Sequence, residues 1–218
     1  MRAPHEDDID ALAHLANNAN IANMVARMPH PYTVADAADF VRRTRAGTIG
    51  KCVYAITKAD NGAFLGCCGI EPHEDGRTVE LGYWLGEPYW NQGYVTEAAH
   101  ALIDWAFTQP DVYYARAITD EGNLASERVL EKLKFQRILT HPAAAVLEDG
   151  QTLWELEKPA SSWMAIYMCL GLGCGGAIGS ALNSYTIGMS IGLALGVALG
   201  VSLDGQDRER RKREQDKK

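Results

Sequence analysis

The chain has 218 residues and a formal net charge of -7, and 47% of its residues are hydrophobic while 22% are charged. This composition is typical of a folded globular protein and excludes a wholly disordered chain. The acidic balance argues against nucleic acid as a partner, and we expect none.

The charge distribution predicts how the chain is organised. Residues 159–203 carry no charge, whereas the residues before them are acidic and the residues after them are rich in both signs. We therefore expect an acidic domain over 1–158, a linker over 159–162, an apolar helical hairpin over 163–203 and a charged tail over 204–218. The polar start predicts no signal peptide, and five scattered cysteines predict free thiols, no metal site and a cytoplasmic domain.

The first 158 residues are predicted to contain both helices and strands. Helical spacing and capping residues predict helices over 8–18, 33–45, 96–107 and 124–133, with a loop over 24–32. Apolar runs bounded by turn residues predict strands over 52–57, 63–70, 78–85, 112–119, 137–140 and 152–157. This order predicts an α/β (α+β mixed) fold with a mixed sheet and helices on both faces.

One segment, between the strand 78–85 and the helix 96–107, indicates a binding site. Gly93 permits a tight turn, and the helix begins directly after it with Thr96 and Glu97. Such a turn directs unpaired backbone N–H groups and the positive end of a helix dipole at the space beyond the strand, which suits a phosphate. The segment is neither a P-loop nor a dinucleotide fingerprint. By itself it also fits a plain strand-to-helix connection.

Residues 80–98 (ELGYWLGEPYWNQGYVTEA) resemble the acyl-CoA signature of the GNAT superfamily of N-acetyltransferases, in the branch of the ribosomal-protein-alanine acetyltransferases. Residues 123–135 are similar to the second motif of that branch, and residues 6–32 resemble its usual start. The resemblance covers residues 1–158. It implies a sheet that splays open after the strand 78–85, with acetyl-CoA as co-substrate in the gap and no metal.

The resemblance also implies the residues that contact acetyl-CoA. The pantetheine is expected beside the splayed strand, where a backbone N–H holds the thioester oxygen, and the pyrophosphate on the turn before the helix. The expected cofactor-binding residues are Tyr83, Trp84, Leu85, Asn91, Gln92, Gly93, Tyr94, Val95, Thr96, Asn123 and Ser126.

The implied reaction is direct attack by a primary amine on the thioester. The amine must be neutral to attack, so a base is needed, and Glu80 is the expected base, directly or through a water. Ser126 is the expected donor to the leaving thiolate. Glu80 as a solvated strand residue and Ser126 as a structural helix residue remain alternatives. The acceptor is open between a protein N-terminus, a small amine and an antibiotic, because the segments 24–32 and 141–150 that build its pocket are variable.

Three positions depart from the family pattern. Asn91 and Lys134 stand where glycine is usual, and Val95 replaces a smaller residue and is expected to crowd the helix start. Asn tolerates a left-handed backbone, whereas Lys at a positive φ costs roughly 1 kcal/mol. The chain also begins near the end of the usual first strand, so we expect that edge strand to be absent. The alternative function is therefore a membrane oligomer or scaffold whose domain binds CoA without turnover.

The tail contains two uncharged runs, 163–182 and 186–203, each about 27–30 Å long as a helix, the thickness of the apolar core of a bilayer. Their glycines recur every four residues, which resembles the glycine-zipper hairpins of small bacterial membrane proteins. The basic cluster 208–213 predicts a cytoplasmic end, so the domain is expected to be tethered to the inner face of a bacterial membrane. We also expect a homo-oligomer through the glycine faces; a helix pair that packs on another protein is the alternative. The glycines are Gly171, Gly175, Gly179, Gly188, Gly192, Gly196 and Gly200.

Overall fold

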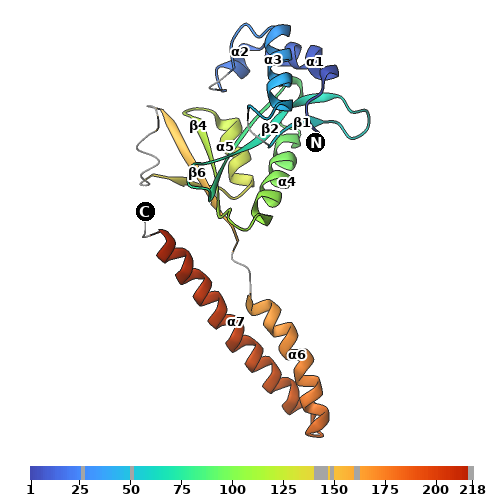
Figure 1. Ribbon diagram of the computed structural model, residues 1–218, viewed down its shortest axis with the longest axis vertical. Coiled ribbons are helices and arrows are strands. Elements are labelled where there is room, and N and C mark those ends of the chain that lie inside the picture. The colour runs from blue at the N-terminus through green and yellow to red at the C-terminus, as the bar shows by residue number, and fades with distance from the viewer. Residues whose placement is uncertain (26–27, 50–51, 140–146, 148–149, 160–162, 216–218) are drawn as a thin grey trace. The chain divides into compact units, whose positions relative to one another are not determined.

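A computed structural model describes residues 1–25, 28–49, 52–139, 147, 150–159 and 163–215. Thr140 of a predicted strand, most of the segment 141–150, most of the linker and the last three residues lie outside this part. The chain divides into two compact units, Met1–Lys158 and Pro159–Lys218, and each is described by itself (Figure 1).

The first unit is built on one mixed sheet of six strands in the order β1-β2-β3-β4-β6-β5 (Figure 1). Only the central β3–β4 pair is parallel, and every other neighbouring pair is antiparallel. This architecture confirms the predicted fold class. The strands are β1 (Cys52–Thr57), β2 (Phe64–Pro72), β3 (Thr78–Leu85), β4 (Tyr114–Asp120), β5 (Gln136–Ile138) and β6 (Gln151–Glu157).

Helices cover both faces of this sheet. The helices are α1 (Ile9–Ala16), α2 (Ala19–Ala22), α3 (Val34–Arg45), α4 (Tyr94–Thr108) and α5 (Leu124–Lys132), with short 3-10 turns at Glu6–Asp8 and Glu87–Tyr89. Two predicted caps are confirmed. The Thr33 hydroxyl accepts from Asp36 N while Thr33 N donates to the Asp36 carboxylate, and the Asn123 side chain accepts from Ser126 N.

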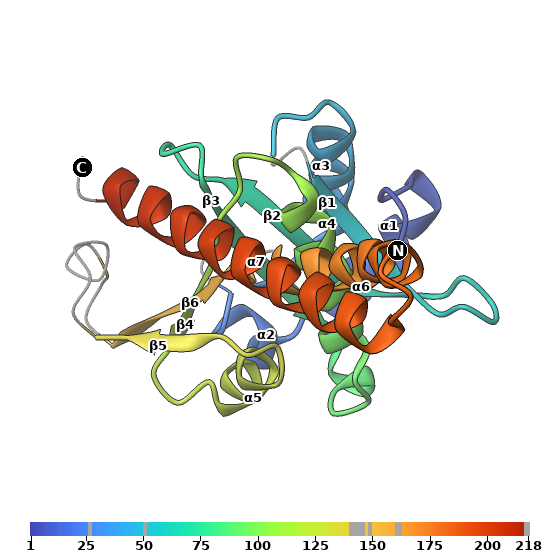
Figure 2. The same ribbon diagram turned by 90° about the horizontal axis from the view of Figure 1, so that it is seen from below.

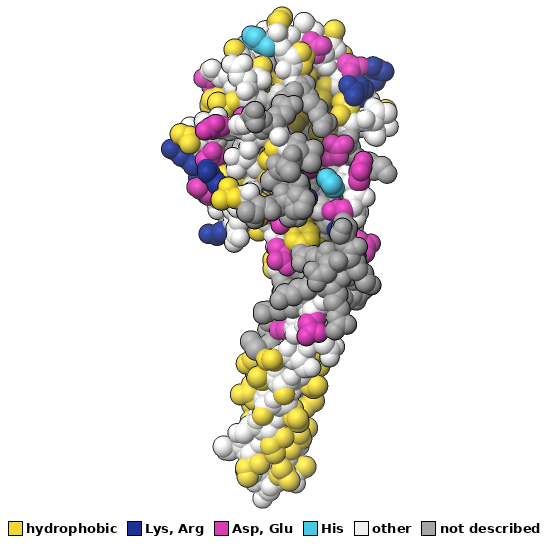
Figure 3. All heavy atoms as spheres, turned by 90° about the vertical axis from the view of Figure 1, so that its left-hand side faces the viewer, with side chains coloured by type: hydrophobic (Ala, Val, Ile, Leu, Met, Phe, Trp, Pro, Cys, Tyr) yellow, Lys and Arg dark blue, Asp and Glu magenta, His cyan; other side chains and the backbone are white. Residues whose placement is uncertain are grey.

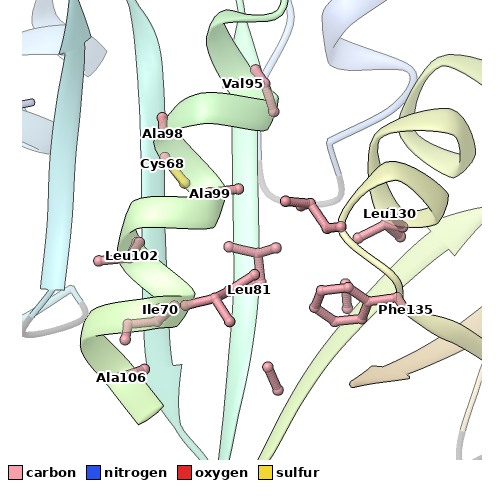
Figure 4. Close-up of a cluster of buried hydrophobic side chains, with 14 of the residues drawn as sticks. Cys68, Ile70, Leu81, Val95, Ala98, Ala99, Leu102, Ala106, Leu130 and Phe135 are labelled. Atoms are coloured by element: carbon pink, nitrogen blue, oxygen red, sulfur yellow. The ribbon is translucent and has the colours of Figure 1, made fainter. Parts of the chain in front are cut away.

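Two apolar clusters hold the helices against the sheet. The larger one packs α4 and α5 against the sheet, with Leu102, Leu81 and Leu130 among its members (Figure 4). The smaller one packs α1 and α3 against β1 and β2 on the opposite face. Adjacent Cys67 and Cys68 belong to different clusters, as the alternation of side chains along a strand predicts.

The edge of β1 carries a short pairing where we expected no edge strand. Arg2 forms an isolated antiparallel bridge with Ala55, with N–O distances of 3.3 and 2.8 Å. The Arg2 guanidinium also donates two hydrogen bonds of 2.6 Å to the buried carboxylate of Asp8. The start of the chain is therefore attached both to the sheet edge and to the turn that leads into α1.

The second unit is an antiparallel pair of helices, α6 (Trp163–Ala181) and α7 (Tyr185–Gln215) (Figures 1 and 2). The reversal between them includes Asn183 in a left-handed conformation, with φ 53°. α7 continues past residue 203, the end of the expected apolar hairpin, into the charged tail as far as Gln215. The residues beyond 203 are rich in Arg, Lys, Gln and Glu, all good helix formers, so the loss of hydrophobicity does not stop the helix.

The glycines of the two helices face one another inside this pair. A Cβ at Gly192 would lie 2.1 Å from the carbonyl oxygen of Gly171, and one at Gly188 would lie 2.2 Å from the backbone nitrogen of Gly179. The large apolar side chains instead point outward, as Figure 3 shows for the lower part of the molecule. The glycine faces on which we based the expected homo-oligomer are thus enclosed within one chain, so that expectation is not supported.

Candidate active site

The central strands β3 and β4 separate partway along their length. Their parallel pairing consists of three residues on each strand and ends with Glu80 opposite Arg116, although β3 continues to Leu85 and β4 to Asp120. Beyond this point β3 pairs with β2 and β4 with β6, so each strand stays with its own half of the sheet. The opening therefore begins within β3, five residues before the strand end after which we had expected it.

The backbone of β3 is directed into this opening. Gly86 N donates to Leu65 O at 2.8 Å, and because antiparallel ladder bonds alternate, Tyr83 and Leu85 point their N–H and C=O groups toward the side of β4. The indole of Trp90 donates to Leu85 O at 2.7 Å, which fixes the turn after β3. Trp84, the predicted residue between them, turns its ring to the other face, where its centroid lies 5.9 Å from that of Phe64.

The turn after β3 leaves the N-terminus of α4 uncapped. Asn91 has φ 60° and Gly93 has φ 87°, and within the described part of the chain no side chain caps the first turn of the helix. The first intrahelical bond runs from Glu97 N to Gly93 O at 3.0 Å, so the N–H groups of residues 94–96 have no acceptor within the helix. Three N–H groups and a helix dipole are thus directed outward, which suits a phosphate.

The side chains of this turn lie clear of those N–H groups. Asn91 and Gln92 are exposed, and Gln92 donates to Pro88 O at 2.9 Å. Val95 was expected to crowd the start of the helix; its side chain is 8% exposed and packs into the larger apolar cluster (Figure 4). The turn therefore keeps its anion-binding geometry despite two departures from the family pattern.

The side chains of Ser126 and Tyr83 contact each other on the side of the opening where α5 lies. The hydroxyl of Tyr83 lies 2.7 Å from that of Ser126, on the first turn of α5. Burial raises the pKa of Tyr83 to about 12, and the hydrogen bond with Ser126 opposes this rise. Asn123, expected to face the pantetheine, uses its side-chain oxygen to cap α5 at Ser126 N at 3.1 Å. The sequence interpretation gave Tyr83 no catalytic part, although strand alternation places it on the face that α5 covers.

Glu80 lies on the other face of β3 from Tyr83, because side chains alternate along a strand. It is exposed, with Glu71 of β2 and Arg116 of β4 as its cross-strand neighbours. Arg116 Nε is 2.7 Å from the Glu155 carboxylate. The expected base and the expected donor thus lie on opposite sides of the sheet. Among the described residues no group of three or more His, Cys, Asp or Glu side chains could hold a metal.

The segments expected to contact the acceptor are described only in part, because residues 26–27, 141–146 and 148–149 lie outside the described ranges. The contacts described above therefore concern the opening between β3 and β4 and the two expected catalytic residues, Glu80 and Ser126.

Comparison with known proteins gives a consistent result. Residues 1–136 match the family model of the acetyltransferase (GNAT) domain. The N-acetyltransferase YjdG of Bacillus subtilis, uncharacterized by its name, is 37% identical over 100 residues, which are 45% of this chain and 58% of that protein. The chain spans about half the length of the curated relatives it matches.

Solved structures share the fold. A GNAT-family acetyltransferase from Bacillus anthracis aligns with a TM-score of 0.62 and 17% identity, over 72% of this chain and 93% of that chain. RimJ of Mycobacterium smegmatis, in complex with a CoA disulfide, aligns with a TM-score of 0.58 and 20% identity, over 72% of this chain and 80% of that chain. At these identities the likeness establishes the fold.

Proposed function

The chain belongs to the GNAT acetyltransferase family, and from this we propose that it transfers the acetyl group of acetyl-CoA to a primary amine by direct attack. The observation that carries the proposal is the uncapped N-terminus of α4 beside the opening between β3 and β4. Acetyl-CoA supplies the acetyl group as a thioester. Members of the fold family that were solved with CoA support the same donor.

The residues of the opening fit this donor. The N–H groups of residues 94–96 would hold the pyrophosphate, and Asn91, Gln92 and Gly93 would form the turn around it. The backbone of Tyr83 and Leu85 would pair with the pantetheine amides along the side that β4 leaves. A backbone N–H at this edge would also stabilise the negative charge that develops on the thioester oxygen.

The two expected catalytic residues would act on opposite faces of β3. Glu80, on the exposed face at the last paired residue before the opening, would accept the proton of the attacking amine. Ser126, on the α5 side, would donate a hydrogen bond to the sulfur as the C–S bond breaks. The acceptor would therefore approach from the Glu80 face, and the thiolate would depart toward α5.

The first test is binding of the donor. Acetyl-CoA that binds only the folded protein must raise the melting temperature of the full chain by mass action. Turnover on a panel of amines, followed as thiol release, then separates the proposed enzyme from the alternative, a scaffold that binds CoA without reaction. Binding without turnover on every N-terminal peptide and small amine in the panel would favour the scaffold.

The role of Glu80 is tested by Glu80→Gln with Glu71→Gln as the matched control. Both carboxylates lie on the same face of neighbouring strands, directly opposite one another. We expect Glu80→Gln to lower kcat by about 10²–10³-fold. Glu71→Gln should lower it far less, because Glu71 lies on β2, one strand further from the opening between β3 and β4. Normal turnover of Glu80→Gln at pH 7–8 would refute the assignment.

For the second unit we propose a glycine-zipper hairpin inserted in a membrane, with both ends and the acetyltransferase domain on the cytoplasmic side. The supporting observation is that glycine lies inside the helix pair and leucine and isoleucine outside, the arrangement that suits a lipid environment. Within the described residues, Tyr185–Gln206 is long and apolar enough to cross a membrane, and Ile166–Ala181 is shorter. The alternative is a helix pair that packs on another protein.

Two cysteines of α6 test the insertion. Cys169 and Cys174 are exposed on the helix pair, whereas in the first unit Cys67 and Cys68 are buried and Cys52 is half-buried, so labelling is assigned to each cysteine separately. In lipid vesicles we expect a charged maleimide to leave Cys169 and Cys174 unlabelled until the vesicles are dissolved and the protein is denatured. A cysteine introduced by Gln206→Cys, at the end of the apolar segment, serves as the accessible control. Equal labelling of all three positions in intact vesicles would exclude insertion.

A further inference from the structure

We propose that Tyr83 is a positioning residue that acts through Ser126, donating to its hydroxyl so that the Ser126 proton is directed at the departing sulfur. This inference rests on the proposed acetyl transfer. It assigns a role in the reaction to a side chain that the sequence interpretation placed only beside the cofactor.

The argument begins with the distances around Ser126. Tyr83 Oη lies 2.7 Å from Ser126 Oγ, and 3.4 Å from the backbone oxygen of the same residue. The shorter contact is the normal length for a hydroxyl pair, whereas the longer one is weak. A hydroxyl carries one proton, so if Tyr83 donates to Oγ, the proton of Ser126 remains for a third group.

The backbone of Ser126 is also held in place. Its backbone N–H is held by the Asn123 cap, so Ser126 sits in the first turn of α5 at a set place. Tyr83 comes from the stretch of β3 beyond its last pairing with β4, 43 residues away in the chain. The pair therefore joins α5 to the edge of the opening in which the thioester is proposed to lie.

The surroundings keep Tyr83 protonated. Its side chain is half-buried, and this burial raises the pKa of the phenol to about 12. Cys68 on β2 is the titratable neighbour that interacts with it, and burial raises the pKa of that thiol to about 12. In the first turn of α5, Glu127 is paired with Arg137. Tyr83 therefore remains a donor throughout the neutral and mildly alkaline range.

The proposed step balances without a net proton from either hydroxyl. The amine nitrogen forms a bond to the carbonyl carbon, the C–S bond breaks, and its electron pair goes to sulfur. The proton lost by the amine goes to Glu80. The thiolate leaves while it accepts a hydrogen bond from Ser126, whose oxygen accepts one from Tyr83.

The experiment measures the Kd of CoA at pH 7 and pH 9.5, with CoA that lacks its sulfur as the ligand control. A site that donates to the thiolate must bind CoA more tightly once the thiol ionises. We expect the ratio of the two Kd values to be about tenfold in the full chain, and near one in Tyr83→Phe and in Ser126→Ala. Tyr54→Phe, which removes a phenol hydroxyl on β1, two strands from Tyr83, should keep the ratio of the unchanged protein.

The double variant decides whether Tyr83 acts through Ser126. If it does, Tyr83→Phe changes neither the Kd ratio nor kcat further when Ser126 is already alanine. Two results would overturn the inference. One is a Kd ratio in Tyr83→Phe as large as in the unchanged protein. The other is a loss caused by Tyr83→Phe in the Ser126→Ala background that equals its loss in the unchanged protein. A ratio near one in the unchanged protein would overturn it too. Because the Kd ratio uses CoA alone, CoA binding with no turnover on any amine would contradict the proposed function and leave the Kd ratio to decide this inference.

Discussion

Lys134 occupies a backbone position that favours glycine, and replacing it should stabilise the protein. Its φ is 68°, in the left-handed region. Phe135 N donates to Leu130 O and Lys134 N to Glu131 O, each at 3.0 Å, which is the hydrogen-bond pattern of a Schellman motif at the end of α5. Both Phe135 and Leu130 are buried in the larger apolar cluster, which holds the motif in place (Figure 4). Lys134 therefore cannot relax to a more favourable conformation.

The expected gain follows from two opposing terms. The left-handed conformation costs a residue with a Cβ about 1–2 kcal/mol. Glycine removes this cost but adds about 0.4–1 kcal/mol of conformational entropy to the unfolded chain. We therefore expect Lys134→Gly to raise the free energy of unfolding by about 0.5–1 kcal/mol. For a unit of this size, that corresponds to a rise in Tm of roughly 1–4 °C.

The assay is urea denaturation of the full chain, followed by tryptophan fluorescence, to which the first unit contributes four of the five tryptophans. Lys134→Ala is the matched control, because it removes the same exposed charged side chain and keeps the Cβ. Alanine should leave the stability within about 0.5 kcal/mol of the original protein. If Lys134→Gly were no more stable than Lys134→Ala, the strain argument would be refuted.

Two further substitutions test contacts in each unit. Burial raises the pKa of Asp8, but hydrogen bonds from the Arg2 guanidinium and the His5 N–H more than offset this and hold the pKa below its usual value. The ionised carboxylate therefore stabilises the folded state above about pH 4, and this stabilisation is lost as the pH falls. Asp8→Asn should cost about 1–2 kcal/mol at pH 7 and flatten the acid limb of a stability–pH profile; an unchanged limb would contradict this. In the helix pair, Gly192→Ala should lower the melting temperature of the helical signal in detergent, because the added Cβ would lie 2.1 Å from Gly171 O. Gly173→Ala is the control and should leave the melting temperature unchanged, because a Cβ there has nothing within 4 Å. Equal melting temperatures of the two variants would refute the close packing.

Local interactions made much of the first unit predictable from sequence. The Thr33 and Asn123 caps and the turn at Gly93 depend on residues that are at most a few positions apart, so a short segment contains all the partners. The alternation that sends Cys67 and Cys68 to opposite faces is likewise a property of the strand alone. The fold class and the uncapped end of α4 could be predicted for this reason.

Long-range pairing decided the rest of the candidate site. The point at which β3 separates from β4, after the pair of Glu80 and Arg116, depends on which strand each half of the sheet pairs with. The direction of Val95 depends on the core that α4 packs against. The contact of Tyr83 with Ser126 joins groups 43 residues apart. None of these contacts can be predicted from the sequence of a single segment.

The second unit shows the same division. Its uncharged length and the four-residue spacing of its glycines are properties of the sequence, and they predicted two close-packed helices. Whether the glycines meet those of another chain or those of the other helix is a question of tertiary structure, and here Gly171 faces Gly192 within one chain. The spacing of the glycines shows which face of each helix is small. The turn at Asn183 brings α7 back along α6, and this determines that the two glycine faces pack against each other.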